Sequence, residues 1–280
     1  MLLLSFLCAY SYSIFIASGP LYLHSVLDSN DINVDFSSIK YASKMTNLDL
    51  SSTGLFSVNG INQAPTLLSL DISRNDFKSS IPKEIFQIST LQQLFMGNNE
   101  FDTSLPSDIG DLQQLRLFSC ASSMLTGPLP KNLGNLKELV HLNLEENALT
   151  GALPIELESM ENLAFVDISG NALDGELLSF SSLNNLRRVD LSKNAFSKSI
   201  PDDFLASVNP LFFDFVDLRG NFLTGVVPSI LSHFDVIYLQ NNLISGIDSE
   251  LCDEARGGLI KQFECDAILC PPGTFNAIGR

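Results

Sequence analysis

Residues 139–154 read Leu-Val-His-Leu-Asn-Leu-Glu-Glu-Asn-Ala-Leu-Thr-Gly-Ala-Leu-Pro, and this stretch decides the fold. Its apolar residues at the first, fourth and sixth positions alternate with polar ones, which is the pattern of a short strand that buries one face. Asn147 follows, where a strand is not expected to continue and where its amide can bond backbone groups of a turn. The arrangement returns about every 24 residues, and such a period indicates a solenoid of stacked repeats.

An asparagine recurs at one position of the repeat, three residues after one apolar residue and two before another. It is present at Asn75, Asn99, Asn147, Asn171, Asn194, Asn221 and Asn242. A stacked column of these side chains would satisfy buried peptide groups of successive turns, which explains why a polar residue recurs beside an apolar run. We therefore expect the column to lie inside the solenoid.

The second half of the repeat carries a glycine, then an aliphatic residue and a proline. Residues 125–130 and 222–228 keep both the glycine and the proline, whereas residues 173–178 end in Leu178 instead of proline. Two further repeats, at Ile81-Pro82 and Ile200-Pro201, keep the proline without the glycine. Glycine permits backbone angles that are closed to other residues, and proline fixes φ, so together they turn the chain across the outer side of the repeat.

These motifs resemble the plant-type leucine-rich repeat, whose unit reads LxxLxLxxNxLxGxIPxxLxxLxx. The resemblance covers residues 45–247 and implies a right-handed, curved α/β solenoid of about nine units. In that family a parallel β-sheet lines the concave face, and irregular or short-helical segments form the convex side. The repeats begin at Met45, Leu67, Leu91, Leu115, Leu139, Leu163, Leu186, Phe213 and Phe234.

Three departures from the repeat pattern mark features specific to this chain. The repeat at Leu115 has Ser123 where asparagine is expected, so we expect a weaker contact there. The repeat at Leu186 is 27 residues long, with its surplus near residues 206–211. The first and last repeats are short, which fits caps that shield the open ends of the stack.

The segments that flank the repeats suggest an exported chain. Residues 1–19 are uncharged and mostly apolar, so we expect a signal peptide or a membrane anchor, followed by an N-terminal cap at 20–44. We expect a disulfide-bonded C-terminal cap at 248–269, and residues 270–280 resemble the start of a cysteine-rich, ephrin-receptor-like module, as in a fragment of a longer ectodomain. The disulfide candidates, one of which is left over, are Cys252, Cys265 and Cys270. Cys120 falls at an inward strand position and is expected to be a small buried hydrophobe.

The charge of the chain excludes one class of partner. A formal charge of −16, from 32 acidic and 16 basic residues, argues against nucleic acid, whose phosphates attract Lys and Arg. Acid is concentrated in the middle repeats, where it could steer basic partners or simply keep a long array soluble. The residues concerned are Glu145, Glu146, Glu156, Glu158 and Glu161.

No pattern typical of an enzyme is present in the sequence. The three histidines are far apart, no nucleophile has a recognisable flank, and neither zinc spacing nor a glycine-rich phosphate loop is found. We therefore predict a non-enzymatic protein without cofactor or metal. The recurring aspartates could share a cation, because adjacent strands lie about 4.8 Å apart, but Leu-Asp-Leu is also a common filling of this strand in the family. They are Asp49, Asp71, Asp167, Asp190 and Asp217.

Several outward strand positions of the concave face carry aromatic or aliphatic residues where polar residues are expected. Phe95 and Tyr238 take the middle outward site, and Leu117, Phe165 and Phe215 take the site two residues earlier. Aromatic residues are enriched in binding hot spots, and charged residues punctuate the same face. The predicted ligand-binding residues are Phe95, Arg116, Leu117, Asn143, Phe165, Asp167, Arg188, Asp190, Phe215, Asp217 and Tyr238.

The family resemblance implies a receptor-like recognition module outside the cell or at its surface. Such a module would bind a protein or peptide ligand, including a co-receptor, on its concave or lateral face, with membrane contact only through the leader or a downstream segment. One alternative is a secreted inhibitor or cell-wall protein that binds a hydrolase or a polysaccharide, which the carboxamides of Gln93, Asn143 and Gln240 would suit. Another is the ectodomain of a receptor kinase whose kinase lies downstream.

Overall fold

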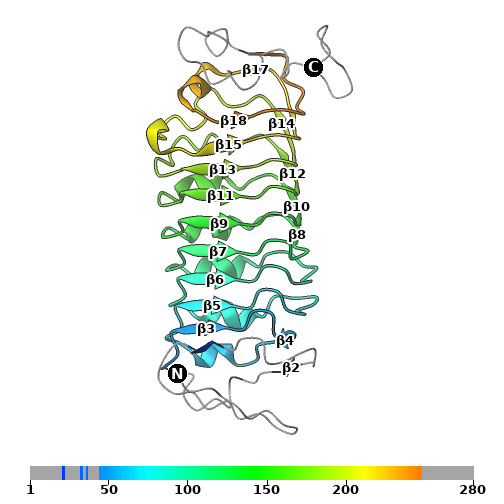
Figure 1. The fold of residues 1–280 in the computed structure, drawn as a ribbon, viewed down its shortest axis with the longest axis vertical. Helices are drawn as coiled ribbons and strands as arrows, with labels where there is room; N and C mark the ends of the chain where they lie inside the picture. The colour runs from blue at the N-terminus through cyan, green and yellow to red at the C-terminus, as the bar shows by residue number, and fades with distance from the viewer. Residues whose placement is uncertain (1–20, 23–31, 34–35, 37–43, 248–280) are drawn as a thin grey trace.

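The computed structural model describes residues 21–22, 32–33, 36 and 44–247. In that part the chain forms one elongated stack of coils, with its strands following one another along the long axis in chain order (Figure 1). The predicted leader at 1–19 and the predicted segments at 248–269 and 270–280 lie outside the described residues. The disulfide candidates Cys252, Cys265 and Cys270 therefore lie outside them too.

A ten-stranded parallel sheet runs along one side of the stack. Each of the nine predicted repeats supplies one strand, and β1 adds a strand ahead of the first repeat. The strands pair in register, so that Leu142 lies between Phe118 and Val166 of the neighbouring coils. The strands are β1 (Leu21–Tyr22), β3 (Asn47–Asp49), β5 (Ser69–Asp71), β6 (Gln93–Phe95), β7 (Leu117–Ser119), β9 (His141–Asn143), β11 (Phe165–Asp167), β13 (Arg188–Asp190), β15 (Phe215–Asp217) and β18 (Ile237–Tyr238).

A second parallel sheet, of five strands, follows the buried asparagines and was not predicted. The sequence indicated only a turn in this segment. The glycines that end three of its strands, Gly127, Gly151 and Gly175, have φ of 69°, 76° and 80°, so the chain does turn at the predicted glycines, and only the strand before them was not expected. The strands are β8 (Thr126–Gly127), β10 (Ala148–Gly151), β12 (Ala172–Gly175), β14 (Ala195–Lys198) and β16 (Phe222–Leu223). Two small sheets pair β2 (Ile32–Asn33) with β4 (Leu55–Ser57), and β17 (Val226–Val227) with β19 (Gly246–Ile247).

Short 3-10 helices close the outer side of most coils. Five of them follow a proline in extended conformation, as the repeat pattern predicts, whereas the coil with Leu178 in place of proline has no helix in residues 176–185. In that coil the Phe180 N–H donates to Glu158 of the preceding coil at 2.6 Å. The helices are η3 (Ile61–Gln63), η4 (Lys83–Gln87), η5 (Ser107–Asp111), η6 (Lys131–Asn135), η7 (Ile155–Ser159), η8 (Pro210–Phe212) and η9 (Ser229–His233). None of the helices in the described ranges has the length and apolar character needed to span a bilayer.

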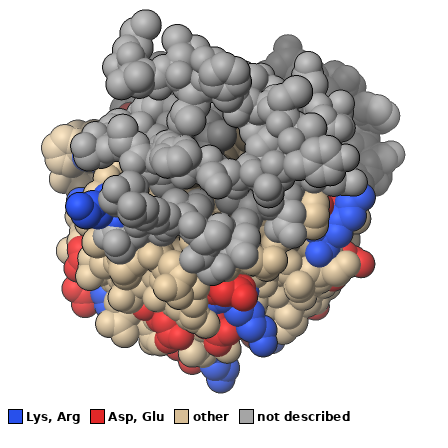
Figure 2. Space-filling view, turned by 90° about the horizontal axis from the view of Figure 1, so that it is seen from below, with Lys and Arg blue, Asp and Glu red and all other residues tan. Residues whose placement is uncertain are grey.

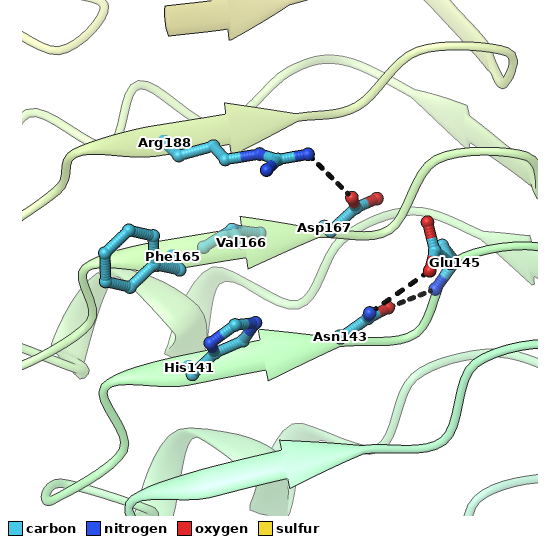
Figure 3. A pocket seen from close by; sticks show the side chains of 7 residues that line it. All are labelled: His141, Asn143, Glu145, Phe165, Val166, Asp167 and Arg188. Carbon is cyan, nitrogen blue, oxygen red and sulfur yellow. Dashed lines mark hydrogen bonds and ion pairs between the residues drawn. The ribbon is translucent and has the colours of Figure 1, made fainter. Parts of the chain in front are cut away.

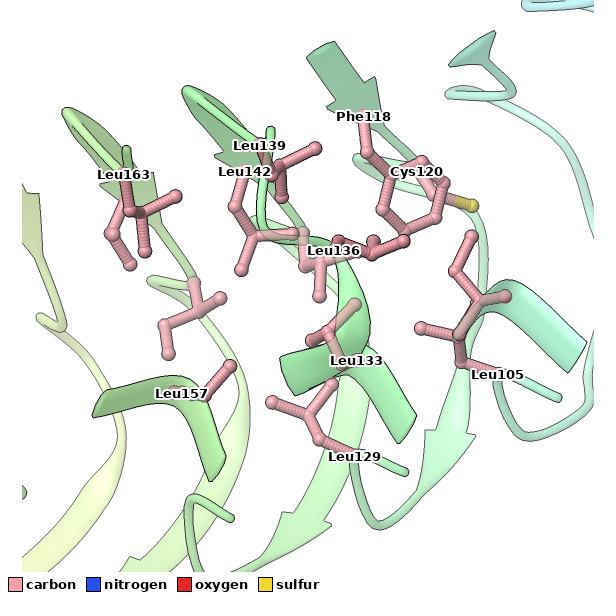
Figure 4. Close-up of a cluster of buried hydrophobic side chains, with 14 of the residues drawn as sticks. Leu105, Phe118, Cys120, Leu129, Leu133, Leu136, Leu139, Leu142, Leu157 and Leu163 are labelled. Atoms are coloured by element: carbon pink, nitrogen blue, oxygen red, sulfur yellow. The ribbon is translucent and has the colours of Figure 1, made fainter. Parts of the chain in front are cut away.

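The apolar positions of the repeat fill one continuous core between the sheet and the helices. Leu139 and Leu142 of one coil and Leu136 at the end of the coil before it are fully buried within this core (Figure 4). Each such leucine contributes about 2 kcal/mol through burial. Cys120 is also fully buried, as predicted, and burial raises the pKa of its thiol to about 12. This thiol is therefore an inert part of the core.

The asparagine column lies inside the stack, as predicted. Asn171 shows the pattern, because its amide donates to the carbonyls of Leu144, Ile168 and Ser169 at 3.0, 3.1 and 3.2 Å. Its amide oxygen accepts from the Leu149 N–H at 3.0 Å. Each asparagine thus ties its own turn to the coil before it, and satisfies backbone groups that the sheet leaves unpaired.

The coil at Ser123 keeps this connection by another route. The Ser123 hydroxyl donates to Met96 and Ala121 carbonyls at 3.1 and 3.0 Å, which replaces part of the missing amide. The Ser123 carbonyl itself accepts from the Phe101 N–H at 3.1 Å, and so takes over the acceptor role. The next residue, Met124, has φ of 58°, a conformation that costs free energy for a residue other than glycine. The contact that was predicted to be weaker at Ser123 is therefore replaced by hydrogen bonds of the Ser123 hydroxyl and carbonyl.

Candidate ligand-binding face

Two columns of side chains point outward from the ten-stranded sheet. The first column holds the first residue of each three-residue strand, and the second column holds the third. The register places Phe165, Arg188 and Phe215 side by side in the first column. We call the outward side chains of β3, β5, β6 and β7 the proximal face, and those of β9, β11, β13, β15 and β18 the distal face.

The predicted ligand-binding residues fall in two groups. Phe95 and Leu117 lie half-buried on the proximal face, and the exposed Arg116 directly precedes β7. The others lie together on the distal face, over five neighbouring strands. These residues are Asn143, Phe165, Asp167, Arg188, Asp190, Phe215, Asp217 and Tyr238.

Rings and guanidinium groups interlock on the distal face. The Arg188 guanidinium carbon lies 4.6 Å from the centroid of the Phe215 ring, and Arg188 Nη2 lies 3.6 Å from Asp167 Oδ2. Arg219 repeats the arrangement, 4.6 Å from the Tyr238 ring, with its Nε 2.9 Å from both carboxylate oxygens of Asp217. Each cation is held between a carboxylate and a ring, and both contacts favour the charged form.

The recurring aspartates are engaged in turns just after the strands. The Ser169 hydroxyl donates to Asp167 Oδ1 and the Ser192 hydroxyl donates to Asp190 Oδ1, both at 2.7 Å. Asp71 on the proximal face has the same partner in Ser73. This local role explains the repetition of aspartate along both faces. Among the described residues, no three His, Cys, Asp or Glu side chains are placed to hold a metal ion.

Asp190 differs from its neighbours in the column. It lies between Asp167 and Asp217, which are each paired with an arginine, but no ion pair reaches Asp190 within the described coils. Burial raises the pKa of its carboxyl above the usual value, the Ser192 hydrogen bonds lower it, and the two neighbouring carboxylates raise it further. Asp190 therefore has no ion pair of its own among the described residues, although its charge helps to raise the pKa of Arg219, whose guanidinium is bonded to Asp217.

A hollow of about 260 Å³ opens over β9, β11 and β13 (Figure 3). The His141 and Phe165 rings form one wall, with centroids 5.4 Å apart. On the other side Asn143 Nδ2 lies 3.3 Å from Glu145 Oε1, and the ion pair of Asp167 and Arg188 completes the lining.

His141 is a residue of this hollow that the sequence analysis missed, whereas Glu145 was named there only as one of the acidic residues that could steer basic partners. His141 takes the first outward site of β9 and Glu145 lies two residues beyond the end of that strand. The repeat pattern could have identified His141, because it occupies the same outward position as Leu117 and Phe165. Burial lowers the pKa of His141, the Arg188 charge lowers it further, and Asp167 opposes both effects. The imidazole is therefore neutral at pH 7.

The excess acid of the chain does not gather into one patch at the N-terminal end of the stack. Figure 2 looks along the solenoid from that end and shows acidic and basic side chains next to each other around the described part.

Comparisons with known proteins agree with the geometry. The family model described as Leucine Rich Repeat matches residues 90–112 and 185–206. No sequence among curated proteins matches significantly. Many solved structures are similar, and three of them are described next.

The first is the LRR ectodomain of the Arabidopsis thaliana receptor kinase GASSHO1/SCHENGEN3 in complex with CASPARIAN STRIP INTEGRITY FACTOR 2, at 27% identity and a TM-score of 0.66 over 73% of this chain and 26% of that one. The second is the ectodomain of the Arabidopsis receptor kinase HAESA with an extended IDA peptide hormone, at 27% identity and a TM-score of 0.67 over 75% of this chain and 36% of that one. The third is a TDR receptor, at 30% identity and a TM-score of 0.66 over 73% and 36%. This chain thus spans 26 to 36% of the length of those three.

Proposed function

Because this chain is a leucine-rich repeat protein, we propose that it is a non-enzymatic recognition module of an extracellular or cell-surface receptor-like protein. Its ligand is a peptide or an extended protein segment that binds along the distal face. The observation that carries this proposal is the interlocked row of rings and guanidiniums over β11 to β18. One of the similar ectodomains, that of HAESA, is described as a complex with a peptide hormone ligand, which supports a peptide here.

The distal face is suited to binding because its side chains are already ordered. Arg188 and Arg219 are fixed by a carboxylate on one side and a ring on the other, so a ligand does not have to immobilise them. Long side chains that are ordered only on binding cost about 0.5–1.5 kcal/mol each. A rigid parallel sheet with preset side chains therefore converts many weak contacts into useful affinity.

The alternative of a polysaccharide ligand is less well supported by the geometry. Sugar rings need open aromatic faces on which to stack. The Phe215 and Tyr238 rings each have a guanidinium 4.6 Å from their centroid, so of these distal-face rings only Phe165, which lines one hollow with Asn143, is left open for a sugar. Gln93 lies on the proximal face, away from these rings.

A protein partner at the lateral edge has a better candidate in Leu211 and Phe212 of η8, which are 87% and 63% exposed. Leu211 belongs to the predicted surplus of the long repeat, and Phe212 directly follows it.

The proposal is tested with peptides selected on the full chain from a random twelve-residue display library. The double variant Phe165→Ala/Arg188→Ala removes one ring and one guanidinium, and should weaken the selected peptides about 30-fold, as expected for two hot-spot residues. The matched control is Lys131→Ala/Ile155→Ala, which removes an exposed cation and an exposed apolar side chain from η6 and η7. We expect the control to bind within about twofold of the unaltered chain.

Two results would overturn the proposal. One is a set of selected peptides whose affinity does not change in Phe165→Ala/Arg188→Ala while the thermal midpoint of that variant stays near that of the unaltered chain. The other is the absence of any selected peptide together with binding to soluble cell-wall polysaccharides, which would favour the alternative.

A further inference from the structure

The hollow beside His141 holds more negative charge than the protein neutralises. Glu145 and Asp167 both line it, and Arg188 is the single cation among its lining residues, 3.6 Å from Asp167. The Glu145 carboxylate accepts a hydrogen bond from Asn143 at 3.3 Å, and no ion pair reaches it within the described ranges. The lining therefore has one carboxylate without a counter-ion.

The same hollow has an aromatic wall, and none of the described guanidinium groups is stacked on it. The Phe165 ring is accompanied by the His141 ring at 5.4 Å, and His141 is neutral at pH 7. A neutral ring wall suits the alkyl stem of a lysine or the plane of a guanidinium. The volume of about 260 Å³ lies below the range of pockets that hold a whole small ligand, and fits a single long side chain.

The distal face itself shows how a cation is held there. Arg188 lies between Asp167 and the Phe215 ring, and Arg219 lies between Asp217 and the Tyr238 ring. Carboxylate, guanidinium and ring thus occur together twice along the face. At Glu145 and Phe165 the carboxylate and the ring line one hollow, and the cation of its lining, Arg188, is instead paired with Asp167 and lies over the Phe215 ring.

We propose that this hollow binds a lysine or arginine side chain of the ligand, with Glu145 as its counter-ion and the Phe165 and His141 rings along its stem. The inference rests on the proposed peptide-binding function and names the class of peptide, which is a basic one. Asp190 extends the preference, because it is a second carboxylate on the distal face without an ion pair among the described residues. Charge complementarity of this kind steers a basic peptide to the face and fixes its register.

The test uses the peptides selected on the full chain and a pair of neighbouring substitutions. Glu145→Gln removes the charge of the hollow and keeps the shape of the side chain and an acceptor for Asn143. Glu146→Gln makes the same change one residue later, at an exposed side chain 3.7 Å from Lys193 and outside the lining. We expect the selected peptides to share a lysine or arginine at one position, and to lose about tenfold in affinity in Glu145→Gln but less than twofold in Glu146→Gln.

A double-mutant cycle assigns the contact to one ligand residue. Replacing the shared lysine or arginine of the peptide by methionine should cost about tenfold against the unaltered chain and almost nothing against Glu145→Gln. Thermal midpoints of the two variants within about one degree of each other exclude a folding defect.

The outcomes separate this inference from the function on which it rests. Peptides that are neutral or acidic, or that bind equally well to Glu145→Gln, overturn the basic-ligand inference, while their loss of affinity in Phe165→Ala/Arg188→Ala would leave the proposed function standing. Peptides whose affinity is unaffected by Phe165→Ala/Arg188→Ala overturn both.

Discussion

The proximal and distal faces are made from the same coil and differ in what they point outward. On the proximal face the neighbouring Ser69 and Gln93 share one exposed hydrogen bond of 3.2 Å. On the distal face Arg188 and Phe215 lie in a row of ring and ion-pair contacts that extends over several coils. The inward positions are filled by apolar residues and asparagines under both faces, with Ser123 as the one replacement among the seven repeats from Leu67 to Phe213, because stacking fixes them. Outward positions are free of that constraint, and so they carry what is specific to this chain.

The largest effect should come from the asparagine column, and it should be equal under both faces. Asn99 under the proximal face donates to the Ile72 carbonyl at 3.1 Å, and Asn194 under the distal face donates to the Ile168 carbonyl at 3.0 Å. Replacing either by alanine leaves several buried backbone groups without partners, at a cost of about 3 kcal/mol. Urea unfolding measures this cost, with the exposed Asn47→Ala as control, for which we expect less than about 0.5 kcal/mol. Unequal costs for the two buried asparagines would show that the coils under the two faces are not equivalent.

A smaller effect should distinguish the faces from each other. Asp217 is 2% exposed and depends on Arg219, so Arg219→Ala leaves a buried carboxylate without its cation and should cost about 2 kcal/mol. The equivalent change on the proximal face is Ser73→Ala beside Asp71, which removes one hydroxyl hydrogen bond and should cost about 0.5–1 kcal/mol. Urea unfolding of both variants gives the difference directly. Equal costs would mean that the ion pairs of the distal face add nothing to the scaffold.

The sequence was sufficient to predict the inward half of each coil. The strand positions, the buried asparagines and the burial of Cys120 all follow from residues that repeat, and a repeated residue reports on a repeated environment. The prolines before the helices follow for the same reason. The second sheet was missed because its strands are ended by the glycines that the pattern placed in a turn.

What the sequence could not give is the outcome of contacts between coils. The hollow depends on His141, Phe165 and Arg188 from three successive coils, and its charge depends on which carboxylates find a cation. The hydrogen bond that replaces the missing asparagine contact at Ser123 could not be predicted from the sequence either, because the Ser123 backbone carbonyl, and not a side chain, accepts it from the Phe101 N–H. Both features arise from contacts between residues of successive coils, whereas the repeat pattern describes each coil separately.

A smaller effect is expected in the pH dependence of the free energy of unfolding, through His141 on the distal face. His141 faces Arg188, Asp167, Glu145 and the Phe165 ring, and its pKa is lowered from 6.5. The unfolded chain therefore binds a proton at His141 more readily than the folded chain does, so stability falls as pH drops below 6.5 and stops falling below the folded pKa. We expect a loss of under about 1 kcal/mol between pH 7.5 and 5.5, most of it absent in His141→Gln.

Asp190 should act in the opposite direction at lower pH. Its pKa is raised above 3.8, so the folded chain binds the proton first and stability gains as pH falls through the folded pKa towards 3.8. Asp190→Asn should remove that gain in stability. For the loss of stability that His141 should cause between pH 7.5 and 5.5, the control substitution is His233→Gln on η9. Urea midpoints at five pH values separate the two windows. A His141→Gln variant with the slope of the unaltered chain would contradict the assignment.

The smallest effect is expected where the two faces meet, in the coil that carries Ser123. Met124 is 52% exposed and has φ of 58°, so Met124→Gly loses little burial and relieves a backbone conformation that favours glycine. We expect a gain of about 0.5 kcal/mol in urea unfolding. The matched control is Ala148→Gly at the equivalent position of the next coil, where φ is negative and glycine should cost about 0.5–1 kcal/mol. A loss at both positions would mean that the backbone at Met124 is unstrained, and that replacing asparagine by Ser123 cost this coil nothing.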